Sequence, residues 1–325
     1  MPKPPAVDFD DCVGLIRVYK DGSVWRANLD NHPTATDDDE DGSVQWKDYV
    51  FNPKNNLSLR LYKPSAAAAA AAKLPVVYNI HGGGFCIGSR TEPYHHGCCL
   101  RLAAQLRAVV VSPDYRLAPE SRLPAAIEDC HSALEWLQRR AAAGDDTWLS
   151  DVADFGKVFV CGESAGGNVA HNLAVRVGSG SPELGPVKIR GYVVLSPSFG
   201  GTVRTKSEVR TPKVQMLTLD MVDWFWKYSI PVGDTCDHPL VNPFGPGTEL
   251  VGPVELDPIL VVSGGGDILV DRIRDYAEKL KELGKRVEYA EFEGEVHGFF
   301  TYDPESKASR SVMDLIRKFV TENSN

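Results

Sequence analysis

From residue 74 to the C-terminus, short apolar segments alternate with longer segments of helical spacing. Strands that alternate with helices along a chain form a mostly parallel sheet with helices on both faces. The pattern therefore predicts an α/β fold. We expect strands over 74–80, 108–112, 157–161, 187–195, 258–262 and 286–292, and helices over 94–106, 124–143, 165–177, 270–283 and 306–320.

Two regions depart from this alternation. Residues 1–44 carry little strand pattern, and two edge strands, over 44–51 and 57–62, then open a core that spans 45–325. Residues 199–233 hold two apparent helices and a cluster of aromatic side chains at 224–228. The cluster either lines a pocket or packs a lid on the sheet, and the sequence leaves both interpretations open.

Composition narrows the class of partner. The chain has 325 residues and a net charge of −9, which argues against nucleic acid and anionic membranes as partners and favours a neutral substrate. No apolar run approaches the ~18 residues of a membrane span. The seven cysteines include no C-x-x-C pair, and the N-terminus shows no secretory signal pattern, so we expect reduced thiols in the cytoplasm or the nucleus. No metal or cofactor is predicted, and the oligomeric state stays open.

The stretch Gly162-Glu163-Ser164-Ala165-Gly166 carries the main chemical signal. It follows the apolar run at 158–161 and precedes a predicted helix, so it reads as strand, sharp turn and helix with Ser164 at the apex. A serine hydroxyl is a weak nucleophile until a base takes its proton, and a tight turn exposes its oxygen to a substrate carbonyl. Only glycine or alanine at the flanks lets the strand and the helix approach closely.

A nucleophilic serine needs a base and a group that orients the base. Of the eight histidines, His297 follows the last predicted strand in a loop and can reach the carboxyl edge of the sheet. Asp267 follows the strand at 258–262 and is the expected orienting acid. Asp271 is its rival, but it falls inside the next predicted helix, where it can cap the helix or pair with an arginine.

The run His81-Gly82-Gly83-Gly84-Phe85 follows the strand at 74–80 and predicts an oxyanion hole. Consecutive glycines leave the backbone free to turn its N–H groups toward a substrate oxygen. Gly83 and Gly84 would donate there, together with the N–H of Ala165. A phosphate loop is the competing interpretation, but no Gly-Lys-Ser/Thr follows. His81 is expected to support the loop from behind, and the charged stretch 114–120 to brace it.

Apolar side chains flank these positions and predict an apolar substrate pocket. The candidate substrate-binding residues are Phe85, Ile87, Trp224, Val296 and Phe299.

Together, these motifs resemble the hormone-sensitive-lipase branch of the α/β-hydrolase superfamily. The residues that carry the resemblance are 81–84, 114–120, 162–168, Asp267 and His297. Plant carboxylesterases are similar to this chain in segments 12–15, 21–24 and 59–64. The strigolactone-hydrolysing carboxylesterase among them is similar to it in segments 85–90 and 242–246. The resemblance implies an α/β-hydrolase fold with a helical cap made of residues 1–44 and about 199–233. It also implies a Ser164, Asp267 and His297 triad that hydrolyses a small apolar ester or lactone, with strigolactone as the expected substrate.

The same branch contains two other classes of protein. Gibberellin receptors bind a hormone without hydrolysing it, and they lack the histidine that this chain has at 297. Other members use the scaffold for dehydration or cyclisation of specialised metabolites, because a serine and a histidine can also act as acid and base. A receptor and a dehydratase or cyclase are therefore the alternatives to an esterase.

Overall fold

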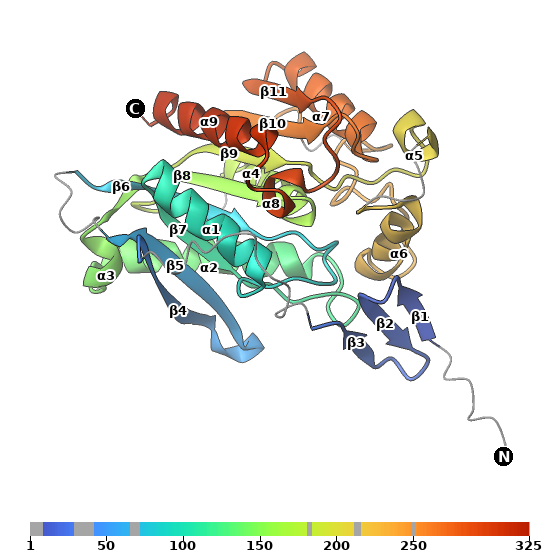
Figure 1. Ribbon diagram of the computed structural model, residues 1–325, viewed down its shortest axis with the longest axis horizontal. Helices are drawn as coiled ribbons and strands as arrows, with labels where there is room; N and C mark the ends of the chain where they lie inside the picture. Colours follow the sequence, from blue (N-terminus) through green and yellow to red (C-terminus); the bar gives the residue numbers. More distant parts are fainter. Residues whose placement is uncertain are drawn as a thin grey trace.

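The computed structural model describes residues 9–28, 42–65, 72–180, 184–210, 216–248 and 251–324. An eight-stranded sheet runs through its centre in the order β11-β10-β9-β8-β6-β7-β5-β4 (Figure 1). The pairs β4–β5 and β5–β7 are antiparallel, and the remaining pairs are parallel. The strands are β4 (Val44–Asn52), β5 (Leu57–Pro64), β6 (Leu74–Ile80), β7 (Val109–Pro113), β8 (Ala153–Glu163), β9 (Ile189–Leu195), β10 (Ile259–Gly264) and β11 (Val287–Phe292).

Helices cover both faces of this sheet, as the alternating pattern predicts. Side chains of neighbouring strand residues point to opposite faces. Tyr78 accordingly packs with one helix layer and Val77 with the other. The first layer contains α2 (Ala125–Ala143), α4 (Ala165–Gly178) and α7 (Val270–Glu282), and the second contains α1 (Pro93–Leu106) and α9 (Lys307–Glu322). Because both faces are covered, the central strands are predominantly apolar rather than alternating.

The region between β9 and β10 forms two helices, as expected, α5 (Lys206–Arg210) and α6 (Leu219–Ser229). Figure 1 shows both at one end of the sheet. Two further short helices, α3 (Thr147–Ser150) and α8 (Phe299–Tyr302), were not predicted, because a four-residue turn shows no helical periodicity. In the described residues, no helix has the length and apolar character that a membrane crossing requires.

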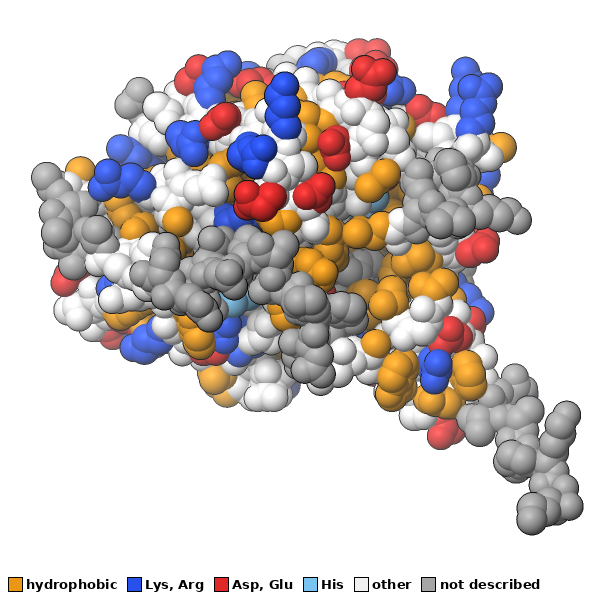
Figure 2. Space-filling model, viewed as in Figure 1, with side chains coloured by type: hydrophobic (Ala, Val, Ile, Leu, Met, Phe, Trp, Pro, Cys, Tyr) orange, Lys and Arg blue, Asp and Glu red, His pale blue; other side chains and the backbone are white. Residues whose placement is uncertain are grey.

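The N-terminal region corrects the sequence prediction. Where little strand pattern was expected, residues 9–26 form a separate three-stranded antiparallel sheet of β1 (Phe9–Cys12), β2 (Ile16–Tyr19) and β3 (Val24–Arg26). Each strand is too short for an alternating pattern to show. The sequence of this region also shows no division into an apolar and a polar face, because several of its apolar side chains are exposed. These are Phe9, Val13 and Trp25. On the face seen in Figure 2, hydrophobic side chains gather beside α6 and this sheet.

Two anchors attach the N-terminal sheet to the rest of the protein. The guanidinium of Arg26 donates to Glu120 and to the carbonyl oxygens of Cys86 and Ala118, at 2.6–2.9 Å. The carboxylate of Asp10 accepts hydrogen bonds from three side chains of α6: Trp224, Lys227 and Tyr228. The sheet is therefore attached to α6 on one side and, near Cys86, to the loop that follows β6 on the other.

We predict that Asp10→Ala loosens the contact between the N-terminal sheet and α6. The variant removes the shared acceptor of three side chains, so amide hydrogens of α6 should exchange faster by mass spectrometry. Asp11→Ala is the matched control, because Asp11 binds only Gly14 and Arg17 within its own sheet. Equal protection of α6 in the wild type and in Asp10→Ala would contradict this account.

Candidate active site

Ser164 lies at the sharp turn between β8 and α4. Its backbone has φ 55° and ψ −119°, a left-handed conformation that a serine rarely adopts. The flanking glycines follow from packing at this turn. A Cβ on Gly162 would lie 2.2 Å from the carbonyl oxygen of Gly166, and one on Gly166 would lie 2.1 Å from that of Ile80. Strand and helix thus meet at a distance that only glycine permits, and the serine oxygen is held at the end of β8.

The structure brings Ser164, His297 and Asp267 into one hydrogen-bonded chain. Nε2 of His297 lies 2.9 Å from Oγ of Ser164, and its Nδ1 lies 2.8 Å from Oδ2 of Asp267. The other oxygen of Asp267 accepts the N–H of Leu269 at 2.9 Å. Asp271 accepts from the N–H of Ser207 and from Arg274 instead. The two ring nitrogens of His297 therefore face the serine and the carboxylate, as acid–base activation of a serine requires.

The glycine loop after β6 lies beside Ser164 in the same cavity. Gly83 and Gly84 have φ of 113° and 58°, and a Cβ on Gly83 would lie 2.1 Å from the carbonyl oxygen of Ile87. Ala165 is the first residue of α4, where a backbone N–H has no partner within its own helix. These three positions fit N–H donors aimed at an oxyanion.

His81 and Tyr115 support this loop from behind. Nδ1 of His81 donates to the carbonyl oxygen of Gly82 at 2.7 Å. The hydroxyl of Tyr115 donates to the backbone carbonyl oxygen of His81 at 3.1 Å. The two rings stack with centroids 4.2 Å apart. Burial lowers the pKa of His81, which keeps its ring neutral. The charged stretch after β7 also braces the region, since Asp114 accepts the N–H of Arg90 at 2.8 Å.

Comparison with known proteins agrees with this geometry. Residues 76–301 match a family model described as the alpha/beta hydrolase fold. Carboxylesterase 20 of Arabidopsis thaliana is 38% identical over 92% of this chain and 93% of that protein. The 3-O-acetylpapaveroxine carboxylesterase of Papaver somniferum is 35% identical over 79% of this chain and 83% of its own. The chain belongs to the plant carboxylesterases of the α/β-hydrolase family.

Solved esterase structures show the same fold. An esterase from Pyrobaculum calidifontis superposes with a TM-score of 0.73 and 30% identity, covering 86% of this carboxylesterase and 85% of that chain. A thermostable carboxylesterase from a metagenomic library gives a TM-score of 0.72 and 31% identity, over 86% and 90% of the two chains. The family is thus one of carboxylic ester hydrolases.

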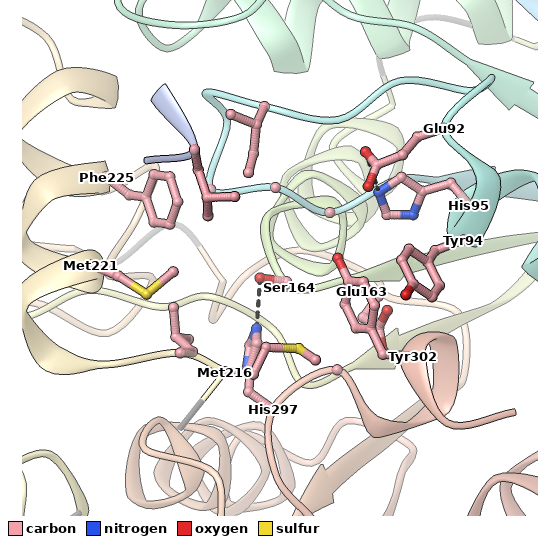
Figure 3. A pocket seen from close by; sticks show the side chains of 17 residues that line it. Glu92, Tyr94, His95, Glu163, Ser164, Met216, Met221, Phe225, His297 and Tyr302 are labelled. Carbon is pink, nitrogen blue, oxygen red and sulfur yellow. Dashed lines mark hydrogen bonds and ion pairs between the residues drawn. The ribbon is translucent and has the colours of Figure 1, made fainter. Parts of the chain in front are cut away.

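The cavity that contains Ser164 has a volume of about 270 Å³ and two chemically different sides. Figure 3 shows Met221 and Phe225 on one side of Ser164, Glu92, Tyr94, His95, Glu163 and Tyr302 on the other, and Met216 beside His297. Ile87 lines the cavity, as predicted, and Leu15 reaches it from the N-terminal sheet. The cavity is therefore apolar toward α6, and polar side chains of α1 and α8 line its other side.

Four predicted substrate-binding residues do not line this cavity. Trp224 is adjacent to Phe225 in α6, so the two side chains leave the helix in different directions. The indole N–H of Trp224 donates to Asp10 of the N-terminal sheet at 3.1 Å. Phe299 packs into the core beneath α9, with its ring 5.6 Å from that of Phe292. Val296 is half-buried and lies outside the set of described residues that line the cavity. Phe85 lines a smaller space on the far side of Gly84.

Sequence reasoning missed several lining residues. Met221 and Phe225 are four residues apart on α6, so helical spacing would have assigned them to one face. Glu92, Tyr94 and Tyr302 carry no such signal, because only the folded chain brings α1 and α8 beside Ser164. In the described part of the chain, no group of three or more His, Cys, Asp or Glu side chains is placed to hold a metal ion.

Burial and neighbouring charges set the protonation of the site. Burial lowers the pKa of His297, but the charge of Asp267 and its hydrogen bond raise it, so the pKa lies above the ordinary value for histidine. Burial raises the pKa of Glu163, against the opposing effects of Thr301 and Arg101. Burial lowers the pKa of His95 to about 3, so this imidazole is neutral. His297 is thus held basic by Asp267.

We predict that labelling of Ser164 by a fluorophosphonate follows the deprotonation of His297. The rate should rise with pH through the raised pKa of His297, because only the neutral ring accepts the serine proton. Asp267→Asn removes the charge that raises the pKa of His297, whereas the burial that lowers this pKa remains. The midpoint of the labelling rate should therefore move to lower pH. The plateau rate should fall by about 10³–10⁴-fold, because asparagine favours the wrong tautomer. Asp271→Asn is the control, and an identical profile for Asp267→Asn and the wild type would refute the assignment.

Proposed function

We propose that this protein is a serine carboxylesterase that hydrolyses small apolar esters or lactones. The observation that carries the proposal is the hydrogen-bonded chain from Ser164 through His297 to Asp267, which lies beside the Gly83–Gly84 loop in one cavity. Membership of a family of carboxylic ester hydrolases supports it. The presence of His297 favours hydrolysis over hormone binding alone.

In the proposed mechanism, His297 takes the proton of Ser164 as its oxygen attacks the substrate carbonyl. The carbonyl oxygen becomes an oxyanion, which accepts hydrogen bonds from the N–H groups of Gly83, Gly84 and Ala165. The imidazolium, stabilised by Asp267, then protonates the leaving alkoxide, and an acyl-serine remains. Water enters, gives a proton to His297 and attacks the acyl carbon. Collapse of the second oxyanion releases the acid, and the proton returns to Ser164.

We predict that Ser164→Ala loses hydrolysis of p-nitrophenyl acetate. Turnover should fall by more than about 1,000-fold, because the attacking oxygen is absent. Ser179→Ala is the matched control, since Ser179 caps the opposite end of α4 and should leave the rate unchanged. Release of p-nitrophenol is followed by absorbance. A Ser164→Ala variant as active as the wild type would exclude a serine mechanism.

For the physiological substrate we propose a strigolactone, cleaved at the carbonyl of its butenolide ring in hormone catabolism. Support comes from the resemblance of residues 85–90 and 242–246 to the strigolactone-hydrolysing carboxylesterase, and from the apolar side of the cavity. The cavity volume of about 270 Å³ lies just below the range that is typical of drug-sized ligands, about 300–1,000 Å³.

We predict that the purified protein consumes a synthetic strigolactone and that Ser164→Ala does not. Loss of substrate and gain of the cleaved product are measured by mass spectrometry. Turnover of p-nitrophenyl acetate with no turnover of the strigolactone would remove this substrate and leave the esterase. Binding of the strigolactone with neither turnover nor fluorophosphonate labelling would instead indicate a receptor.

A further inference from the structure

Two spaces of unequal size meet at Ser164. The larger is the cavity of about 270 Å³ described above. The smaller, which we call the niche, has a volume of about 20 Å³. Gly84, Leu217 and Phe225 lie between the two spaces and line both. The niche is completed by side chains that do not line the larger cavity: Phe85, Ser198, Val222 and Trp226.

The position of His297 determines which half of an ester each space receives. After Ser164 attacks, the oxygen of the leaving alcohol must take a proton from Nε2 of His297, so the alcohol has to lie on the His297 side of the carbonyl carbon. His297 lines the larger cavity, whereas the residues that line the niche include Ser164 and Gly84 but not His297. The alcohol half therefore belongs in the larger cavity, and the acyl half in the niche.

The volume of the niche limits the length of the acyl half. A space of about 10–15 Å³ holds a single water. The niche therefore has room for one or two non-hydrogen atoms beyond the carbonyl carbon, which corresponds to an acyl group of about two or three carbons. Its lining is mostly apolar, so a methyl or ethyl group fits it better than a polar group.

Packing and backbone geometry resist enlargement of the niche. The rings of Phe85 and Trp226 pack with centroids 5.9 Å apart, and both side chains are buried. The Phe225 ring lies against the backbone of Gly84, where a Cβ would come within 2.4 Å of it. The carbonyl of Phe85 also accepts the N–H of Ala118 at 2.8 Å, which holds the loop in place. A longer acyl chain would have to displace these rings from a packed core.

We propose that the niche restricts this carboxylesterase to esters with an acyl group of about two or three carbons and places the bulk of the substrate in the alcohol half. This proposal rests on the esterase function proposed above and adds its substrate class. A butenolide is compatible with it, because its acyl carbons form a ring that closes back to the leaving oxygen, so only the carbon bonded to the carbonyl would enter the niche. The remainder of a strigolactone, attached on the ring-oxygen side, would occupy the larger cavity.

The first test compares p-nitrophenyl esters of acetate, butyrate, hexanoate and octanoate, in which the alcohol is constant. We expect kcat/KM to be highest for acetate and at least tenfold lower for hexanoate, because each methylene that does not fit costs about tenfold or more. No turnover of any ester would refute the esterase function itself. Turnover that is equal for acetate and hexanoate would refute only the acyl restriction.

Two neighbouring residues of α6 supply the variants. Val222 lines the niche but not the larger cavity, and Met221 lines the larger cavity but not the niche. Val222→Ala should raise the ratio of hexanoate to acetate kcat/KM by about tenfold. Val222→Ile should lower the ratio of butyrate to acetate, and it supplies the test if the smaller variant does not fold. Met221→Ala is the control and should leave these acyl ratios within about twofold, since it acts on the alcohol side.

The variants also test the orientation of the ester. Acetate esters of alcohols of increasing size should respond to Met221→Ala and not to Val222→Ala. If Met221→Ala changes the acyl ratios while Val222→Ala changes the alcohol preference, the ester lies the other way round and the proposal is wrong. Thermal denaturation of each variant establishes that the folded proteins are being compared.

Discussion

The close approach of β8 and α4 around Ser164 is the constraint on which the rest of the site depends. A non-glycine residue in the left-handed region costs of order 1–3 kcal/mol, and the surrounding structure must hold it there. The N–H of Ser164 donates to the carbonyl of Leu195 on β9, and its own carbonyl accepts from Asn168 and Ser198. The strained serine is thus tied to the neighbouring strand and to the segment that follows it, which fixes the direction of its oxygen.

The order of the strands then decides what surrounds that oxygen. β8 lies between β6 and β9, so the loop after β6, which carries Gly83 and Gly84, ends beside the serine. β10 and β11 follow on the other side, and the loops after them bring Asp267 and His297 to the same edge. Parallel strands share a carboxyl edge, and in open α/β sheets ligands bind outside that edge. One folding pattern therefore brings Ser164, His297, Asp267 and the glycine loop to the same edge of the sheet.

The cavity has a different origin, because apart from Glu163 at the end of β8 its described lining residues lie outside the strands of the central sheet. Leu15 comes from the N-terminal sheet, Met221 and Phe225 from α6, and Tyr302 from α8. Asp10 joins the N-terminal sheet to α6, so two segments more than 200 positions apart in the chain act as neighbours. α6 also contributes to both spaces, since Met221 and Val222 differ by one position on this helix and line different spaces. The shape of both spaces thus depends on how α6 is rotated and anchored.

The sequence by itself determined the α/β alternation and the local turn chemistry, because both depend on residues that are close in the chain. The spacing of apolar residues marked the central strands and the long helices, and Ser164, Asp267, His297 and the glycine loop each followed a predicted strand. The β1–β3 sheet escaped prediction because three- and four-residue strands with exposed apolar side chains show no period. Only the tertiary structure decided that Phe225 rather than Trp224 lines the cavity, that Glu92 and Tyr302 form a polar side, and that a small niche adjoins the serine. These features depend on the rotation of helices and on contacts between distant segments, which local periodicity does not encode.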